Sequence, residues 1–130
     1  MPGETNTTEA IYVLDDDPSV LRSISRLLAS EGLKFRTFSD PKSLLSSIEV
    51  QPVPVVILDI WMEKITGLEV QSKLSRLSPR TRVIIMTGRS DVGVQQTAME
   101  LGAAAYFTKP FDDLEFMHAV RASLAAGARE

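Results

Sequence analysis

The chain has no cysteine, which excludes a disulfide framework and any thiolate metal site. It also lacks an apolar run of about 20 residues, the length that a membrane-spanning helix needs. Basic residues are not in excess, because 14 lysines and arginines stand against 17 acidic residues and are scattered among them. We therefore expect no membrane insertion and no direct binding of nucleic acid. The absence of cysteine agrees with a reducing compartment, and we predict a cytoplasmic location.

The 130 residues are enough for one compact domain with a core of its own. Their composition, 44% hydrophobic and 24% charged, is typical of a globular protein. Residues 1–9 are polar and have neither the basic start nor the apolar centre of a signal peptide, so we predict a disordered leader. We place the domain at residues 10–126 and interpret residues 127–130 as a tail or the start of a linker.

Short apolar runs alternate with longer amphipathic segments along the chain. The apolar runs predict five strands, at residues 10–14, 33–38, 53–60, 82–87 and 104–108. The segments between and after them have helical spacing and predict helices at residues 20–31, from 41 onward, 67–77, 92–101 and 112–126. Strands that alternate with helices predict an α/β fold, with a doubly wound parallel sheet covered by helices on both faces.

Polar residues stand where the predicted strands end. In a doubly wound sheet, ligands bind outside the carboxyl ends of the strands. Four strands carry candidate functional residues at or just after that end: Asp15, Asp16 and Asp17, then Asp59, then Thr87, and finally Lys109 with Pro110. We therefore expect carboxylates, a hydroxyl and an ammonium group to meet at one edge of the sheet.

The three consecutive aspartates repel one another unless they are solvated or a cation lies among them. A site of carboxylate oxygens, with no thiolate and no nearby histidine, favours Mg²⁺ or Mn²⁺ over zinc. Asp15 and Asp16 are the candidate metal ligands, whereas Asp17 precedes a proline and is expected to cap the first helix. Taken alone, the run leaves open the alternative that all three residues only form the turn and the cap.

Asp59 ends an apolar run, and a buried carboxylate is costly unless it is paired or functional. A carboxylate can act as a nucleophile toward phosphorus and form an acyl phosphate. Phosphoryl transfer needs in-line positioning and neutralisation of charge, for which a metal ion and Lys109 are suited, and the Thr87 hydroxyl can donate to a phosphoryl oxygen. Singly, Lys109 fits a surface charge and Thr87 an ordinary strand residue. Neither interpretation explains why these residues converge on one edge.

The segments LDD, ILDIWMEKITGLE, IIMTG and AAYFTKPF, in this order and spacing, closely resemble the receiver domain of bacterial two-component response regulators. The resemblance covers about residues 10–126. It implies a flavodoxin-like sheet with the strand order 2-1-3-4-5. It also implies that Asp59 accepts a phosphoryl group, and that Asp15, Asp16, Asp59 and the backbone carbonyl of Trp61 hold Mg²⁺.

The same resemblance implies roles for residues of the last strands. Thr87 and Lys109 would contact the phosphoryl group, Tyr106 would rotate when Thr87 moves, and the peptide bond before Pro110 would be cis. The chain would then be a signalling module that catalyses its own phosphorylation and dephosphorylation, not a metabolic enzyme. Its partners would be a sensor histidine kinase and an output domain or protein. The surface that changes would be the fourth helix, fifth strand and fifth helix, and a phosphorylation-dependent dimer is one expected outcome.

Some residues depart from the family pattern. Glu63 stands where proline is usual, which predicts a more mobile loop and a spare carboxylate near the metal. Gly88 stands where alanine is common, which predicts a looser loop after the fourth strand. Trp61 is bulkier than usual at its position and is expected to alter access to the phosphoryl group. For Arg89, in the same loop as Gly88, two roles stay open: tuning of acyl phosphate hydrolysis, or a simple surface charge.

Two other classes of protein share parts of the pattern. An aspartate-nucleophile phosphohydrolase carries a second acid two residues after its nucleophile, where this chain has Trp61. A flavodoxin-like mononucleotide binder needs a phosphate-cradling loop after its first strand, and three aspartates are electrostatically wrong there. The segments MTGRSDVG and YFTKPFDD particularly resemble receivers attached to helix-turn-helix transcription factors. A piece of such a regulator and a complete single-domain regulator stay open as alternatives.

Overall fold

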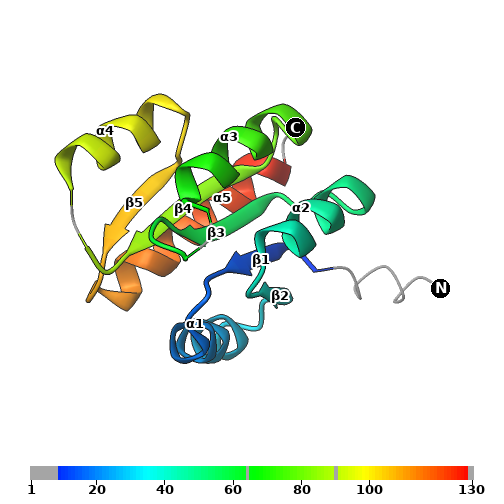
Figure 1. Ribbon diagram of the computed structural model, residues 1–130. Coiled ribbons are helices and arrows are strands. Elements are labelled where there is room, and N and C mark those ends of the chain that lie inside the picture. Colours follow the sequence, from blue (N-terminus) through cyan, green and yellow to red (C-terminus); the bar gives the residue numbers. More distant parts are fainter. Residues whose placement is uncertain (1–8, 64, 90, 129–130) are drawn as a thin grey trace.

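Strands and helices alternate along the chain in the computed structural model, which describes residues 9–63, 65–89 and 91–128 (Figure 1). The strands are β1 (Ile11–Leu14), β2 (Phe35–Phe38), β3 (Val55–Asp59), β4 (Arg82–Thr87) and β5 (Ala105–Thr108). The helices are α1 (Pro18–Ser30), α2 (Pro41–Val50), α3 (Gly67–Leu77), α4 (Val92–Glu100) and α5 (Asp113–Ala128). Residues 1–8 of the predicted leader lie outside the described residues.

The described strands form one parallel sheet in the order β2-β1-β3-β4-β5. β1 lies between β2 and β3, so that Leu14 is in register with Phe38 on one side and Leu58 on the other. The chain winds from β1 to one edge of the sheet and then back past β1 toward the other edge. This reversal opens a crevice at the carboxyl ends of β1 and β3. The predicted fold class and strand order are confirmed.

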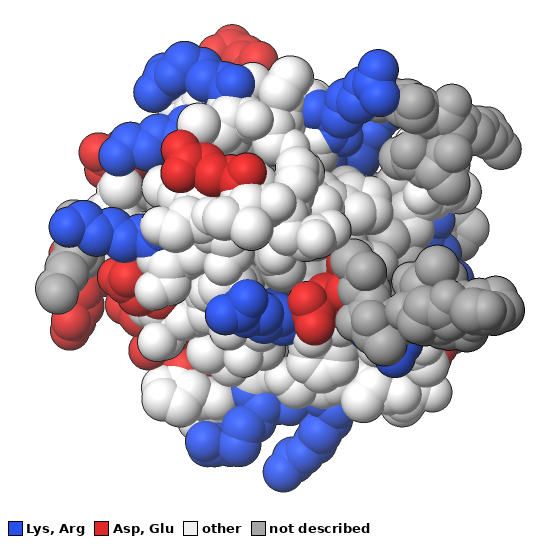
Figure 2. All heavy atoms as spheres, turned by 90° about the vertical axis from the view of Figure 1, so that its right-hand side faces the viewer, with Lys and Arg blue, Asp and Glu red and all other residues white. Residues whose placement is uncertain are grey.

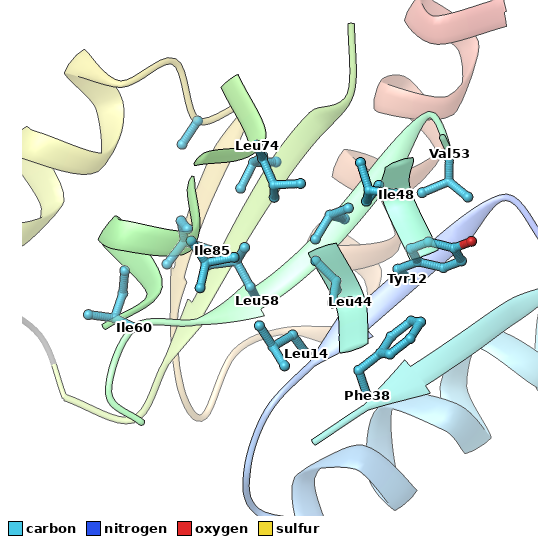
Figure 3. Packing of buried hydrophobic residues seen from close by; sticks show 14 of the residues in the cluster. Tyr12, Leu14, Phe38, Leu44, Ile48, Val53, Leu58, Ile60, Leu74 and Ile85 are labelled. Atoms are coloured by element: carbon cyan, nitrogen blue, oxygen red, sulfur yellow. The ribbon is translucent and has the colours of Figure 1, made fainter. Parts of the chain in front are cut away.

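Alternate strand residues face opposite sides of the sheet and build two hydrophobic cores. Tyr12 and Leu14 of β1 belong to the core that packs against α2, α3 and α4 (Figure 3). Ile11 and Val13 belong to the core that packs against α1 and α5. Because both faces of β1, β3 and β4 are covered, these strands appear in the sequence as nearly continuous apolar runs.

Capping residues fix the loops that leave the carboxyl ends of the strands. Asp17 accepts a hydrogen bond of 2.9 Å from the Ser19 N–H at the start of α1, as predicted. Pro18 takes the first helical position, and α1 therefore begins two residues earlier than predicted. Thr66 forms a capping box at the start of α3, in the loop that follows β3. The loops after β1 and β3 are thus held by helix caps close to the candidate site residues.

The described residues contain no membrane-spanning helix, and the face drawn in Figure 2 has no continuous patch of one charge. No helix within the described ranges is long and apolar enough to cross a bilayer. Figure 2 shows the molecule from the right-hand side of Figure 1, where the amino ends of the strands lie. Basic and acidic side chains are interspersed on that face, and neither sign forms a continuous patch. This agrees with the scattered charges in the sequence.

Gly67 lets the start of α3 lie directly against the end of β3. Its N–H donates a hydrogen bond of 2.8 Å to the Ile60 carbonyl. A Cβ atom added at Gly67 would overlap the backbone carbonyl of Asp59. No side chain fits there unless the backbone of Asp59 moves, so Gly67 positions the residue that the sequence marks as the candidate nucleophile.

We expect Gly67→Ala to lower the free energy of unfolding by about 1–3 kcal/mol, because the added methyl group overpacks a backbone contact. Gly93→Ala in α4 is the matched control, since a Cβ there meets only Asp91 Oδ1 at 3.4 Å. That change is expected to be neutral or to stabilise by up to about 1 kcal/mol. Urea denaturation of both variants measures the difference, and equal effects would contradict the role given to Gly67.

Candidate functional site

A pocket of about 350 Å³ opens at the carboxyl ends of the strands. Its lining comes from the loops after β1, β3, β4 and β5, and from the end of β3 itself. The lining residues are Asp15, Asp16, Asp17, Asp59, Trp61, Gly88, Arg89 and Lys109. The predicted meeting of carboxylates and an ammonium group at one edge of the sheet is therefore present in the structure.

Three carboxylates form the acidic centre of this pocket. One oxygen from each of Asp15, Asp16 and Asp59 lies within 4.8 Å of the others. Asp15 and Asp59 are buried, while Asp16 is exposed. Asp15 Oδ2 and Asp59 Oδ1 are buried and have no hydrogen-bond partner among the described residues. Unbonded carboxylate oxygens at this spacing fit a hard divalent cation such as Mg²⁺ or Mn²⁺.

Burial and crowding shift the titration of this centre. Desolvation, with the nearby charge of Asp15 as a second cause, raises the pKa of Asp59 to about 6, against the lowering effect of Lys109 and of backbone N–H groups. Desolvation also raises the pKa of Asp15, although the Asp17 N–H and Lys109 favour its charged form. Without a cation, the protein therefore holds these carboxylates in an environment that disfavours their charge.

Lys109 and Asp17 stabilise Asp15 from two sides. The Lys109 ammonium lies 3.6 Å from Asp15 Oδ2. The backbone N–H of Asp17 donates a hydrogen bond of 2.9 Å to Asp15 Oδ1. Asp17 itself caps α1, so the three consecutive aspartates divide into a buried acid, an exposed acid and a helix cap. The bond between Lys109 and Pro110 is cis, as predicted.

Asp16 is tied to the loop after β3. The backbone N–H of Glu63 donates a hydrogen bond of 3.0 Å to Asp16 Oδ2. Proline has no N–H, so the residue that is usual at this position in the family would not make this bond. The expectation of a more mobile loop considered only the missing ring. The structure adds a contact that holds the loop to the acidic centre.

Thr87 lies at the end of β4, beside the pocket. It is fully buried and is not among the residues that line the pocket. Its hydroxyl donates to the Arg89 carbonyl at 3.2 Å and accepts from the Arg89 N–H at 3.3 Å. In the described state, the hydroxyl is therefore engaged with backbone next to the pocket and not with the acidic centre.

Arg89 and Trp61 both line the pocket and contact each other. The Arg89 Cζ atom lies 4.0 Å from the centroid of the Trp61 ring. The indole N–H of Trp61 also donates a hydrogen bond of 3.2 Å to the Arg89 carbonyl. The sequence left Arg89 open between two roles, and the structure places it in the pocket lining. In the sequence, the only indication that Arg89 lies at the site is its position two residues after Thr87.

Tyr106 and His118 differ in their surroundings. Tyr106 on β5 packs against the core below α4, and its hydroxyl is buried with no hydrogen-bond partner within the described residues. Burial, with Asp91 as a second cause, raises the pKa of this hydroxyl. His118 is exposed on α5 and does not line the pocket. Sequence reasoning missed Gly67, although a glycine at the predicted start of a helix is a signal of close backbone contact.

The fold and the site define a class of protein: a doubly wound α/β domain with an oxygen-rich acidic pocket and a lysine at the carboxyl ends of its strands. Residues 11–121 match the family model of the response regulator receiver domain. The chain belongs to this family, as the resemblance in the sequence indicated.

Two curated relatives are regulators of similar sequence. The chain is 35% identical to the response regulator protein TodT of Pseudomonas putida and 37% identical to the transcriptional regulatory protein FixJ of Azorhizobium caulinodans, each over 120 residues. Both alignments cover 92% of this chain, but only 53% of TodT and 57% of FixJ. The chain thus spans about half the length of the curated relatives it matches.

Solved structures agree with this assignment. A response regulator receiver protein from Burkholderia phymatum is 38% identical, with a TM-score of 0.79, over 91% of this chain and 96% of that chain. A receiver domain protein from Methanospirillum hungatei has a TM-score of 0.86 at 24% identity, over 93% of this chain and 97% of that chain, and shows the fold alone.

The raised pKa of Asp59 predicts how stability depends on pH in the absence of divalent cations. Because the folded pKa of about 6 lies above the unfolded value, ionisation of Asp59 destabilises the fold. This lowering of the free energy of unfolding is absent below about pH 4, where Asp59 is protonated in both states, and is complete above about pH 6. In a chelator, Asp59→Asn should therefore raise the free energy of unfolding by on the order of 1–3 kcal/mol at neutral pH, and by little at about pH 4.

Urea denaturation at the two pH values measures this difference. Glu49→Gln, which neutralises an exposed carboxylate of α2 away from the site, is the control and should change stability little at either pH. A benefit of Asp59→Asn that is equal at both pH values would show that burial does not raise the pKa of this carboxyl.

Proposed function

We propose that this receiver domain accepts a phosphoryl group on Asp59 from a sensor histidine kinase, with Mg²⁺ bound, and acts as a phosphorylation-dependent switch. The observation that carries the proposal is the buried Asp59 carboxylate, whose Oδ1 has no partner among the described residues and which lies beside two further carboxylates in an open pocket. A buried acid with an oxygen that accepts no hydrogen bond is costly, and a functional role explains its presence.

Asp15, Asp16, Asp59 and the backbone carbonyl of Trp61 would hold the cation. A bound Mg²⁺ supplies positive charge that offsets the repulsion among the carboxylates and the charge of the transferred phosphoryl group. Mn²⁺ has the same preference for oxygen ligands and would serve in its place. Asp15 Oδ2 and Asp59 Oδ1, which accept no hydrogen bond from the described residues, are consistent with this ligand set.

In the transfer step, an oxygen of Asp59 attacks the phosphorus of the kinase phosphohistidine as the bond from phosphorus to nitrogen breaks. Lys109 lies in the same pocket and would neutralise charge on the phosphoryl oxygens. Thr87 would donate its hydroxyl to one of these oxygens after leaving the Arg89 carbonyl. Attack of water on the acyl phosphate reverses the modification, so the domain catalyses both reactions on itself and has no separate metabolic substrate.

The surface of α4, β5 and α5 is the part that we propose to change on phosphorylation. α4 packs loosely, because Ala98 is its only buried residue among those described, while Val92 is 80% exposed. Leu114 on α5 is also 82% exposed. Tyr106 lies between these helices on β5 and would respond to the movement of Thr87. A receiver domain solved as a beryllofluoride-activated dimer, that of NtrC4, is 27% identical to this chain.

The output that we propose is control of transcription, in the cytoplasm, through an attached or partner DNA-binding domain. FixJ is a transcriptional regulatory protein, and this chain covers 57% of its length. The basic residues of the chain itself are scattered, which supports a role in signalling and not in direct contact with DNA.

Phosphorylation of Asp59 is tested with a small acyl phosphate and Mg²⁺, followed by mass spectrometry of the intact protein and of its peptides. We expect one phosphoryl group on the wild-type chain and none on Asp59→Asn, because the amide is not a nucleophile. Asp40→Asn makes the same chemical change at the cap of α2, outside the acidic pocket, and should retain phosphorylation.

The same assay tests the ligands of the cation. Asp15→Asn/Asp16→Asn should abolish the Mg²⁺-dependent reaction, and removal of Mg²⁺ with a chelator should do the same to the wild-type chain. Undiminished modification of the Asp59→Asn variant would contradict the assignment of the nucleophile. Undiminished modification without Mg²⁺ would contradict the metal site alone.

Association through the α4-β5-α5 surface is tested by sedimentation with and without beryllofluoride and Mg²⁺. We expect a shift toward a dimer when beryllofluoride is bound, and Val92→Ser should weaken it, because this side chain is 80% exposed at the start of α4. Val50→Ser removes an equally exposed apolar side chain on α2 and is the matched control. A monomer in both states would point to another protein as the reader of the switch.

A further inference from the structure

The Thr87 hydroxyl is already engaged in this structure. A hydroxyl has a single proton to donate, and here it goes to the Arg89 carbonyl at 3.2 Å. The proposed function needs that proton for a phosphoryl oxygen on Asp59. The switch must therefore exchange one acceptor for another, and whatever stabilises the Arg89 carbonyl in its present place opposes that exchange.

Trp61 stabilises this carbonyl from the facing loop. Its indole N–H donates to the Arg89 carbonyl at 3.2 Å, and its ring supports the Arg89 guanidinium, with Cζ 4.0 Å from the centroid. The two contacts join the loop after β3 to the loop after β4. A tryptophan is suited to both, because it combines an N–H donor with the best aromatic face for a cation.

We propose that Trp61 is a positioning residue that latches Thr87 in the state described here. The latch consists of the indole hydrogen bond and the stacked guanidinium, which together hold the Arg89 backbone where it accepts from Thr87. The inference rests on the proposed role of Thr87 and deepens it by naming the residue that sets how readily Thr87 is released.

The latch changes the ratio of two states, one in which Thr87 bonds the Arg89 carbonyl and one in which Thr87 is released, and it blocks neither. When Thr87 leaves and the loop after β4 moves, the Arg89 carbonyl gives up the indole N–H and, at an exposed residue, is solvated by water instead. The contacts nevertheless favour the present loop position. Any ligand that requires the released state therefore binds with an apparent affinity reduced by the small population of that state.

Substitution of Trp61 separates the two contacts without changing the charge. Trp61→Phe keeps an aromatic face for the guanidinium and removes the N–H, whereas Trp61→Leu removes both. We expect the side chain of Thr87 to sample more than one χ1 rotamer in the metal-free variants, and more so in Trp61→Leu. Three-bond couplings to the Thr87 methyl carbon, measured by NMR on the full metal-free chain, report this directly.

The second measurement is the concentration of beryllofluoride that gives half saturation in Mg²⁺, followed by the amide signals of the same protein. We expect it to fall by about two- to ten-fold in Trp61→Phe, the range that one hydrogen bond accounts for. Arg36→Ala is the matched control, because it removes an arginine whose Cζ lies 4.9 Å from the centroid of the Phe38 ring, outside the pocket lining. It should change neither measurement.

A single Thr87 rotamer in both Trp61 variants would overturn the latch, as would a rise in the beryllofluoride concentration needed for Trp61→Phe. The proposed function fails separately. If wild-type Asp59 took neither a phosphoryl group nor beryllofluoride while the Thr87 rotamers responded to Trp61→Phe, the latch would stand and the role of Asp59 would fall.

Discussion

Mutual repulsion among Asp15, Asp16 and Asp59 is the central physical constraint on this molecule. Their oxygens lie within 4.8 Å of one another, and two of the three residues are buried. Each charge raises the free energy of the others, and burial removes the water that would screen them. A sheet with apolar cores on both faces supplies the stability that such an arrangement lowers. The residues at this site therefore lower the stability of the fold, and a functional role accounts for their presence.

Backbone groups, more than side chains, hold the acidic centre in place. The Asp17 N–H bonds Asp15, the Glu63 N–H bonds Asp16, and the close approach of Gly67 fixes the backbone of Asp59. Backbone donors are positioned by the helix caps and strand ends around them and lose little freedom on binding a carboxylate. Such donors favour the charged form of the acids without closing the pocket.

The sequence predicted the fold well because its signals are local. The strand predicted at residues 82–87 and the helix predicted around residues 67–77 match β4 and α3, since an apolar run marks the first and helical spacing marks the second. The run 53–60 forms a shorter strand, Val55–Asp59, than predicted. Pro54 has no N–H for the sheet, and the Ile60 carbonyl accepts from Gly67 instead.

The candidate site was predictable in its members but not in its connections. Residues at the ends of parallel strands must share one edge of the sheet, so Asp15, Asp59 and Lys109 were found from their positions alone. The engagement of Thr87 by Arg89 depends on the path of a loop. The stack of Arg89 on Trp61 joins residues 28 positions apart in two different loops. No periodicity or short motif encodes such contacts.

Two departures from the family pattern act in the same direction. Glu63 contributes a backbone N–H that proline lacks, and Trp61 contributes an indole N–H; the first bonds Asp16 after β1 and the second bonds Arg89 after β4. The loop after β3 is thus tied to its neighbours on both sides of the pocket. A loop held at two points loses less conformational entropy when a ligand orders it. The missing proline ring and the bulky tryptophan, considered separately, predicted a more mobile loop and altered access to the phosphoryl group. Considered through their hydrogen bonds, Glu63 holds the loop at the acidic centre before a cation arrives, whereas Trp61 holds the Arg89 carbonyl where it engages the Thr87 hydroxyl.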